Sequence, residues 1–324
     1  MELEKYNSCA GLSSLVVAAI IMTITEDNNN NEPDTSCCAS CGTAEVDDIA
    51  LKKCTACYLV RYCGVKCQRE HRPQHKRACK KRAAELRDEL LFKQPESTHH
   101  GDCPICLLPL PLDLDCYTMR SCCSKIICDG CSVAFTMQQM QQMLDEKCPF
   151  CRKPVPTEEE NIRYRMKRIE ANDPIAMCQE GTRSYAKGDY SSAFEYFSKA
   201  AKLGDADAHS YLALMYHDGH GVEKDEKKEI YHYEEAAIGG HPSARFNLAL
   251  IDRKRYGRDR ATKHHIIAAG QGHDGSLTWL LENHRRGGFV KKEVLGAALR
   301  AHQAAVDATK SPQREEAKKV FITD

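Results

Sequence analysis

The sequence predicts a multidomain protein in which two small zinc-stabilised modules precede an all-α helical-repeat solenoid. Seventeen of the 19 cysteines fall between Cys37 and Cys151, most of them in C-x2-C pairs, a spacing that suits metal chelation. Beyond Cys151 an alanine-rich helical pattern recurs at intervals of 36 and 32 residues. Stacked repeats of that period bury a continuous core, whereas a short cysteine-rich segment needs a metal ion to fold.

Composition narrows the partners that we expect. The 324 residues carry 46 basic and 46 acidic side chains, but residues 52–93 alone hold 13 basic and 4 acidic ones, a net charge of +9. Such a stretch can bind nucleic acid. We favour a solvated basic helix that follows a zinc site, so nucleic acid is not an expected partner.

The cysteines also indicate the compartment. A disulfide-rich secreted protein is the alternative to a zinc protein, but paired C-x2-C spacing favours metal. Zinc-bound thiolates require a reducing environment, so we expect a cytoplasmic or nuclear protein.

The first segment, residues 1–36, is expected to be an apolar leader and a polar linker. The run AGLSSLVVAAIIMTIT at residues 10–25 would span about 24 Å as a helix, short of the ~30 Å hydrocarbon core of a bilayer. Acidic residues before this run do not suit a signal peptide. A membrane is therefore not an expected partner, and anchoring by residues 10–25 is the alternative.

The first module, residues 37–80, contains eight zinc-binding side chains in the pattern C-x2-C, C-x2-C, C-x3-C, H-x3-C. Zinc takes four soft donors in a tetrahedron, and each C-x2-C pair places two sulfur atoms on one side of the ion. The histidine and the last cysteine are four residues apart and share a helix face. These candidate ligands are Cys38, Cys41, Cys54, Cys57, Cys63, Cys67, His75 and Cys79.

This module resembles a MYND zinc finger, including Tyr62 before Cys63 and Gln68 after Cys67. The resemblance implies interleaved pairing, with Cys38, Cys41, Cys63 and Cys67 on one Zn2+ and Cys54, Cys57, His75 and Cys79 on the other. MYND fingers bind proline-containing peptides, often through a tryptophan where this chain has Arg72. We expect zinc and a protein or peptide partner here, without that aromatic contact.

The second module, residues 102–153, follows a basic helix and linker at residues 81–101. Its three C-x2-C pairs, together with CPIC and CPFCRKP, resemble a RING finger. Between the last two pairs, apolar residues recur at spacings of three and four, which predicts a short helix packed into the core. These residues are Phe135, Met137, Met140, Met143 and Leu144.

Two ligands of the second module are not obvious. A RING finger usually has a histidine as its fourth ligand, but Lys125 stands at that position and an ammonium has no lone pair for zinc. Cys123, five residues before Cys128, is the expected fourth ligand. For the third we favour the adjacent Cys122 over Cys116, which would leave a six-residue gap.

The RING resemblance implies a cross-brace and therefore four Zn2+ ions per chain. Cys103, Cys106, Cys128 and Cys131 would hold one ion, and Cys122, Cys123, Cys148 and Cys151 the other. Such fingers hold a ubiquitin-charged conjugating enzyme through an apolar residue in the first pair, a proline in the last pair and a following cation. Ile105, Pro149 and Arg152 occupy these positions. RING ligases form no covalent intermediate, and these three residues do not decide whether the module is catalytic. Enzymatic activity is therefore left open.

A charged connector at residues 154–173 leads to helical repeats at residues 174–310 and a tail at residues 311–324. The AAxxG signature ends at Gly204, Gly240 and Gly272, where glycine can end a helix with positive φ. The segment YLALMYHDGHGVEKDEKKEIYHYEEAAIGGH resembles a Sel-one-like repeat, a relative of the tetratricopeptide repeat. That resemblance implies a solenoid that binds proteins or peptides.

The sequence also predicts where three further residues of the repeats lie. His264 and His265 are expected at the surface, without a function, and Trp279 in the core.

Two functions follow from this organisation. We expect a zinc-binding interaction adaptor whose fingers and repeats tether partners. The alternative is a RING-type ubiquitin ligase that positions a charged ubiquitin-conjugating enzyme while the repeats recruit the substrate.

Overall fold

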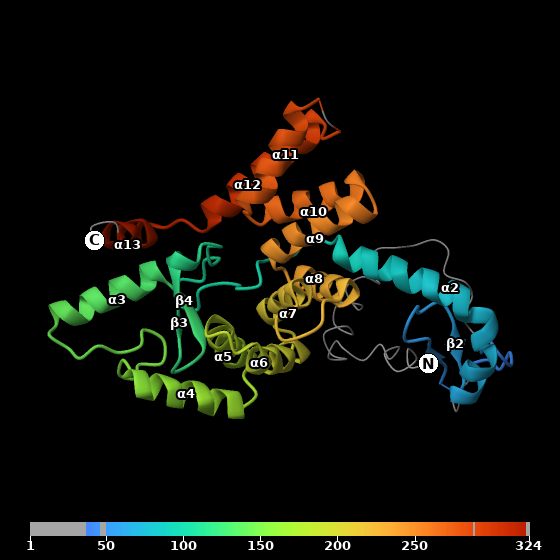
Figure 1. Ribbon diagram of the computed structural model, residues 1–324, viewed down its shortest axis with the longest axis horizontal. Coiled ribbons are helices and arrows are strands. Elements are labelled where there is room, and N and C mark those ends of the chain that lie inside the picture. Colours follow the sequence, from blue (N-terminus) through green and yellow to red (C-terminus); the bar gives the residue numbers. More distant parts are fainter. Residues whose placement is uncertain (1–36, 46–49, 288, 322–324) are drawn as a thin grey trace. The chain divides into compact units, whose positions relative to one another are not determined.

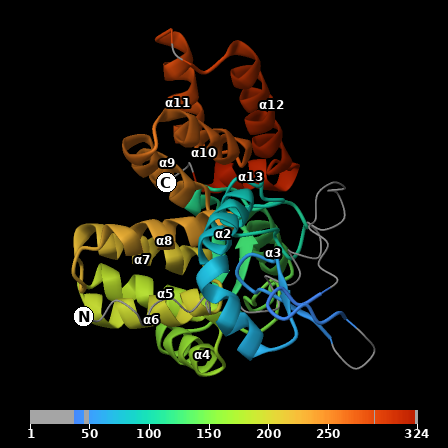
Figure 2. The same ribbon diagram turned by 90° about the vertical axis from the view of Figure 1, so that its right-hand side faces the viewer.

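The computed structural model describes residues 37–45, 50–287 and 289–321, and the chain divides into two compact units, Met1–Lys93 and Gln94–Asp324. Figures 1 and 2 show the elements of each unit. The apolar run at residues 10–25 lies outside the described residues. Among the helices that are described, none combines the length and apolarity that a membrane span requires.

The first unit is a small finger followed by one long helix. Strands β1 (Lys52–Lys53) and β2 (Arg61–Tyr62) pair antiparallel, and helix α2 (Val65–Leu91) follows directly. The expected short ligand helix and the expected basic helix are one continuous element. Its lysines and arginines are mostly exposed, because the residues that face inward, such as His75, belong to the finger.

The second unit begins with the RING-like module. A short 3-10 turn (Leu114–Cys116) leads into the antiparallel hairpin of β3 (Tyr117–Arg120) and β4 (Lys125–Cys128), which pairs Arg120 with Lys125 next to the turn. Helix α3 (Asp129–Gln141) follows without a break. The core of the RING-like module consists of two thiols and two aliphatic side chains, Cys103, Leu110, Ile127 and Cys128.

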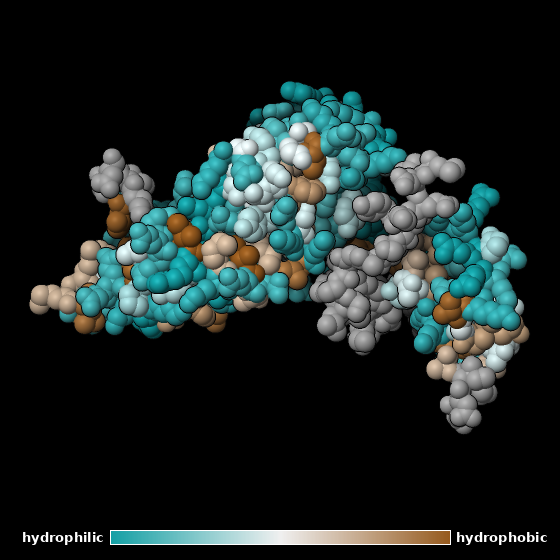
Figure 3. Space-filling view, turned by 60° about the horizontal axis from the view of Figure 1, so that its bottom comes forward, coloured by the Kyte–Doolittle hydropathy of each residue, from teal (hydrophilic) through white to brown (hydrophobic). Residues whose placement is uncertain are grey.

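The apolar stripe expected between Phe135 and Leu144 does not lie in the core: helix α3 ends at Gln141, before Met143 and Leu144, and Phe135 is only partly buried. Met137, Met140 and Leu144 are about half exposed or more, and Met143 is 94% exposed. Gln139 is buried instead, where its amide donates to Asp145 O and accepts from Lys147 N. A module this small fills its interior with metal ligands, so helical spacing alone did not identify the buried face. The face drawn in Figure 3 is mainly hydrophilic, with small hydrophobic patches.

The connector contains helix α4 (Glu158–Glu170), which starts with a capping box. The Thr157 hydroxyl accepts the amide of Glu160, whose carboxylate accepts the amide of Thr157. Three glutamates in the first turn and two basic residues in the last suit the helix dipole.

Antiparallel helix hairpins form the remainder of the second unit, up to α12. Helices α5 and α6, α7 and α8, and α9 and α10 pack as pairs, and each pair packs on the next. Their bounds are α5 Pro174–Ala186, α6 Tyr190–Lys202, α7 Ala206–Asp218, α8 Glu226–Ile238, α9 Pro242–Arg255, α10 Arg258–Gly270, α11 Asp274–Arg285 and α12 Lys292–Ala308.

The loops that join successive pairs share one construction. Gly204, Gly240 and Gly272 have φ between 83° and 90°, a conformation that glycine adopts without steric cost. The next residue is an N-cap in each case, since Asp205 accepts the amide of Ala208 and the histidines that follow the other two glycines accept corresponding amides. The recurring signature thus encodes both a helix end and a helix start.

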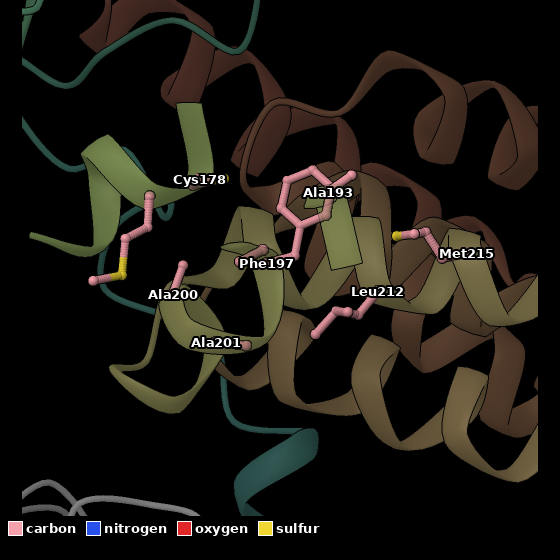
Figure 4. Close-up of a cluster of buried hydrophobic side chains, with 9 residues drawn as sticks. Cys178, Ala193, Phe197, Ala200, Ala201, Leu212 and Met215 are labelled. Carbon is pink, nitrogen blue, oxygen red and sulfur yellow. The ribbon is translucent and has the colours of Figure 1, made fainter. Parts of the chain in front are cut away.

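The core of the first repeats centres on Phe197, which is fully buried (Figure 4). Its ring stacks on Tyr211 with centroids 4.6 Å apart. Gly181 makes room for it, because a Cβ there would lie 2.7 Å from the Phe197 ring. Small side chains let the helices approach, and Ala193, Ala200 and six further alanines of the signatures and neighbouring helices are buried completely: Ala208, Ala213, Ala236, Ala237, Ala268 and Ala269.

His264 and His265 are fully buried, so the expectation that they lie at the surface is wrong. His264 Nε2 lies 3.1 Å from the Asp252 carboxylate, and His265 Nδ1 lies 3.3 Å from Ser276 Oγ. The ring of Trp279 stacks on His265 at 4.1 Å and is partly buried. One ring nitrogen of each histidine thus has a polar partner on a neighbouring helix, which a single-helix pattern does not show.

Two segments expected to be a linker and a tail pack on the second unit. Residues 94–101 run along the repeat loops, where His99 N donates to Gly240 O at 3.1 Å and Gln271 Nε2 lies 3.4 Å from Ser97 O. At the other end, residues 312–321 form helix α13 (Pro312–Phe321), which packs on α3.

Candidate metal centres

Four of the five C-x2-C pairs form knuckles of one geometry, and the fifth, Cys128 and Cys131, lies at the start of helix α3. In each of the four knuckles, the residue after the second cysteine has a positive φ, between 57° and 73°, and its amide donates to the carbonyl of the first cysteine at 2.8–3.0 Å. These residues are Gly42, Tyr58, Leu107 and Arg152. The turn that results aims both sulfur atoms toward one point, which is what a shared metal ion requires.

The MYND-like module brings together the two expected sets of ligands. Cys38, Cys41, Cys63 and Cys67 place their sulfur atoms within 4.8 Å of one another, and Cys54, Cys57, His75 and Cys79 do the same with three sulfur atoms and a ring nitrogen. The knuckles supply the first two ligands of each set. The turn after β2 and helix α2 supply the others, which explains the interleaved order.

The distances fit zinc. A tetrahedral ion with Zn–S bonds of about 2.3 Å separates its sulfur ligands by about 3.8 Å. The Cys41–Cys63 and Cys54–Cys79 sulfur atoms lie 3.6 and 3.8 Å apart. A disulfide would need about 2.05 Å.

His75 is held as a neutral ligand by its surroundings. Burial, together with the neighbouring His71, lowers the pKa of His75, which keeps a lone pair available at neutral pH. Its Nε2 lies 3.1 Å from Cys57 Sγ. The His71 ring stacks on it at 5.7 Å, and His71 Nδ1 lies 3.1 Å from the buried Tyr62 hydroxyl. Tyr62 and His71 thus orient the imidazole.

The RING-like module brings together two further sets. Cys103, Cys106, Cys128 and Cys131 form one cluster, and Cys122, Cys123, Cys148 and Cys151 the other, each within 4.8 Å. The Cys106–Cys128 and Cys123–Cys148 sulfur atoms are 3.8 and 3.9 Å apart, again the spacing of a tetrahedral zinc.

The β3–β4 turn decides which cysteine joins the second of these clusters. The amides of Cys123 and Ser124 both donate to Arg120 O, and Ser124 has φ of 51°, which turns the chain sharply enough to present two adjacent thiols. Cys122 Sγ lies 3.4 Å from Cys151 Sγ. Cys116 lies outside the cluster, with its thiol 3.6 Å from the Asp113 carboxylate.

The thiols do not all ionise easily without a cation. The Cys128 thiol donates to Cys103 and, with nearby backbone amides, lowers the pKa of Cys103 to about 4 in spite of burial. Burial raises the pKa of Cys57 to about 12 and that of Cys123 to about 11, and neighbouring thiolates add to the effect. A divalent ion removes this conflict, because it lets all four sulfur atoms of a site be thiolates.

The three residues expected to contact a conjugating enzyme differ in exposure. Ile105 is 41% exposed and Arg152 is exposed, with its guanidinium 4.5 Å from the Phe135 ring centroid. Pro149 is buried, because the last knuckle folds it inward. Ile105 and Arg152 are therefore accessible to a partner, and Pro149 is not.

A further cluster was not predicted from the sequence. His99, Asp207 and His241 bring their ligand atoms within 4.8 Å, and both imidazoles approach one carboxylate oxygen, at 3.1 and 3.4 Å. His241 Nδ1 accepts the amide of Ala244, so its proton sits on Nε2 and points at Asp207. Two imidazole N–H donors on a carboxylate account for the cluster, which clamps residues 94–101 to the repeats. Its members come from three separate segments, so no local motif could reveal it.

Comparison with family models identifies two parts of the chain. Residues 38–79 match the MYND finger model, and residues 176–205 and 206–241 match the Sel1 repeat model. A MYND finger implies zinc, in agreement with the cluster geometry. The RING-like interpretation of residues 102–153 rests on the cysteine clusters alone.

Similar proteins match the repeat region. The protein "Putative beta-lactamase HcpC" of Helicobacter pylori is 39% identical over 56 residues, which is 17% of this chain and 19% of that protein. The chain thus spans about a fifth of the length of that relative.

Two solved structures also resemble the chain. A Sel1 repeat protein from Oxalobacter formigenes is 26% identical with a TM-score of 0.42, covering 48% of this chain and 67% of that one. A protective antigen of uropathogenic Escherichia coli with an SLR fold is 21% identical with a TM-score of 0.36, covering 51% and 37%. The chain carries a MYND finger at residues 38–79, and Sel1 repeats at residues 176–241 within a predominantly helical solenoid.

Proposed function

We propose that this chain is a zinc-dependent protein-interaction adaptor in which a MYND finger, a RING-like finger and Sel1 repeats present binding surfaces. Saturation of the metal clusters carries the proposal. Each of the four cysteine-rich clusters in the described part of the chain offers four side-chain ligands. A tetrahedral zinc with four protein ligands has no open position for water or substrate, which is typical of structural sites.

The repeats are the main partner-binding surface in this proposal. Helical solenoids bind proteins on extended faces. On the repeats, Leu203, Tyr231 and Leu250 are 50%, 42% and 40% exposed. The MYND finger has the exposed Arg72 in place of an aromatic residue, so its partner is not held by stacking on that position.

Capture experiments on the full zinc-loaded chain test the adaptor function. Wild type, the repeat variant Leu203→Glu/Leu250→Glu and the finger variant Cys38→Ser/Cys41→Ser are immobilised at equal density, with Lys187→Glu as an exposed control. Quantitative mass spectrometry of bound proteins should show one set of partners lost with the repeat variant and another lost with the finger variant. Identical sets for all four proteins, or no proteins above the empty resin, would overturn the proposal.

A RING-type ubiquitin ligase is the second candidate, because Ile105 and Arg152 are exposed at the positions that would hold a charged conjugating enzyme. Catalysis would then consist of positioning the thioester for attack. The test adds the full chain to a panel of ubiquitin-charged conjugating enzymes and follows discharge. Acceleration that is lost in Ile105→Ala and Arg152→Ala, and kept in the exposed control Lys147→Ala, supports the ligase. No acceleration with any carrier enzyme removes it.

A further inference from the structure

The C-terminal helix reaches the first metal cluster of the RING-like module. Arg314 on α13 lies 208 residues after Cys106, yet its Nη2 is 3.4 Å from Cys106 Sγ. The Arg314 side chain is almost completely buried, at 5% exposure, and α13 packs on α3 (Figure 1). A buried guanidinium needs acceptors for its donors, and the module supplies them to Nη1 and Nη2.

The guanidinium binds the turn that closes the first knuckle. Arg314 Nη1 donates to Pro109 O and Thr309 O, both at 2.6 Å, and Nη2 donates to Leu108 O at 3.1 Å. Leu108 O also accepts the amide of Cys103 at 2.9 Å. One side chain of α13 therefore holds a carbonyl that accepts a second hydrogen bond of the knuckle, from its first cysteine.

Close approach of the two helices is built into the backbone. A Cβ at Gly130 would lie 2.8 Å from Arg314 N and 2.9 Å from Arg314 Cα. Backbone atoms cannot move aside as the end of a flexible side chain can, so this contact requires glycine. Gly130 lies between the ligands Cys128 and Cys131, which means that α13 touches the metal-binding segment itself.

The positive charge of Arg314 can compensate negative charge at the zinc site. Four thiolates around one Zn2+ carry a net formal charge of about −2, and negative charge that is partly removed from water is costly unless hydrogen bonds compensate it. A guanidinium N–H that donates to a ligating sulfur is a charge-assisted hydrogen bond. Groups that contact metal ligands in this way typically alter metal affinity by about 10- to 100-fold when they are removed.

We propose that Arg314 is an outer-sphere partner of the zinc site formed by Cys103, Cys106, Cys128 and Cys131, and that α13 is an integral part of the RING-like module. The inference rests on zinc binding by that cluster, as in the proposed function, and goes beyond it. Retention of one ion then depends on a helix near the C-terminal end of the chain.

Zinc release from the full chain tests the inference. An excess of a colorimetric chelator is added, and alkylation followed by mass spectrometry reports which cysteines become reactive. In Arg314→Gln, one ion should leave about 10- to 100-fold faster, with alkylation at Cys103, Cys106, Cys128 and Cys131 while Cys122, Cys123, Cys148 and Cys151 stay protected. Arg314→Lys keeps the charge without the forked guanidinium, and its rate of zinc release should lie between those of wild type and Arg314→Gln. Lys318→Gln and Lys319→Gln, on the same helix and exposed, should match wild type.

A second variant leaves Arg314 in place. Gly130→Ala pushes α13 away through the backbone contact and should reproduce the selective release, which keeps the test decisive if Arg314→Gln does not fold. Release from both RING-like sites together would indicate general unfolding and overturn the inference, as would unchanged rates in both variants. If Cys103 and its cluster are reactive already in zinc-loaded wild type, the zinc assignment fails along with the role of Arg314.

Discussion

The MYND finger and the Sel1 repeats build their cores from different materials. The buried cluster of the finger consists of Cys38, Cys54 and Cys57 together with Leu51 and Tyr62, and partly buried side chains pack against it. Three of these five side chains are candidate metal ligands, so much of the interior would be a coordination sphere. A segment of this size buries too little apolar surface to fold unaided.

The repeats have a core of ordinary apolar packing. Met177, Phe197, Leu212 and Met215 are at most 4% exposed, and alanines fill the spaces between the helices. Their stability comes from apolar area that is removed from water, at about 25 cal/mol per Å2. One chain thus contains a part whose fold depends on a metal and a part whose fold does not, and they should respond to different perturbations.

Metal removal should give the largest difference between these parts. Each structural zinc contributes about 10–16 kcal/mol at neutral pH, so a strong chelator should unfold residues 38–79 and 103–151 while α5–α10 stay folded. Amide hydrogen exchange read by mass spectrometry distinguishes the two responses, and added zinc should restore protection. Loss of protection in α5–α10 along with the fingers would show that the repeats need the metal as well.

Substitution of a single thiol should distinguish zinc ligands from other cysteines within the RING-like module. Cys122→Ser removes one of four ligands and should lower the zinc content by about one ion per chain, because three ligands hold zinc far more weakly. Cys116→Ser is the matched control and should leave the content unchanged. Elemental analysis of the purified chain measures both. The reverse result would place Cys116 in the site.

A cavity in the repeats should act on stability without affecting zinc. Phe197→Ala removes a fully buried ring and should cost about 3–5 kcal/mol, measured by urea unfolding. Leu203→Ala, at a half-exposed position of the same hairpin, should change stability by less than about 0.5 kcal/mol. Zinc content should equal that of wild type in both. Zinc loss in Phe197→Ala would mean that the repeats support the metal sites.

The smallest effect, over the range from pH 7.5 to pH 5.5, is a pH dependence of the stability of the repeats. Burial lowers the pKa of His265 to about 3, below its unfolded value of about 6.5. Between these values the unfolded chain binds a proton that the folded chain does not, so stability falls as pH decreases from about 6.5 toward 3, by up to about 1.4 kcal/mol per unit. Trp279, the single tryptophan, stacks on His265, and its fluorescence in urea reports the transition.

The variant His265→Gln provides the check on this pH dependence. It should be less stable than wild type at neutral pH, yet its unfolding midpoint should vary less between pH 7.5 and pH 5.5. If the unfolding midpoint of His265→Gln varies with pH as much as that of wild type, the pH dependence belongs to other groups.

The features that the sequence predicted are those encoded locally. A knuckle closes with a hydrogen bond between residues four apart, such as Leu107 N to Cys103 O, so its spacing is visible in the chain. The repeat loops are also local, since Gly240 and the N-cap His241 are neighbours. Where ligands are shared between distant knuckles, resemblance to known fingers was needed to group them.

The features that the sequence did not predict join distant segments. Nothing around Arg314 indicates that its guanidinium binds a turn some 200 residues earlier, and residues 312–321 read as a tail. The burial of His265 depends on Ser276 and Trp279, which belong to the next helix. The methionines of α3 show the opposite error, because apolar spacing indicates a helix face without showing which face is covered.

The contact of Arg314 with the first knuckle of the RING-like module also sets the order in which the parts of this zinc site form during biosynthesis. A ribosome adds roughly 5–20 residues per second, so the 208 residues between Cys106 and Arg314 take about 10–40 s to make. The finger is complete only when Cys151 has been made, so in the later part of that interval it can leave the ribosome and bind zinc, while α13 does not yet exist. In this proposal the outer sphere of the zinc site is therefore completed only after the finger that contains its ligands.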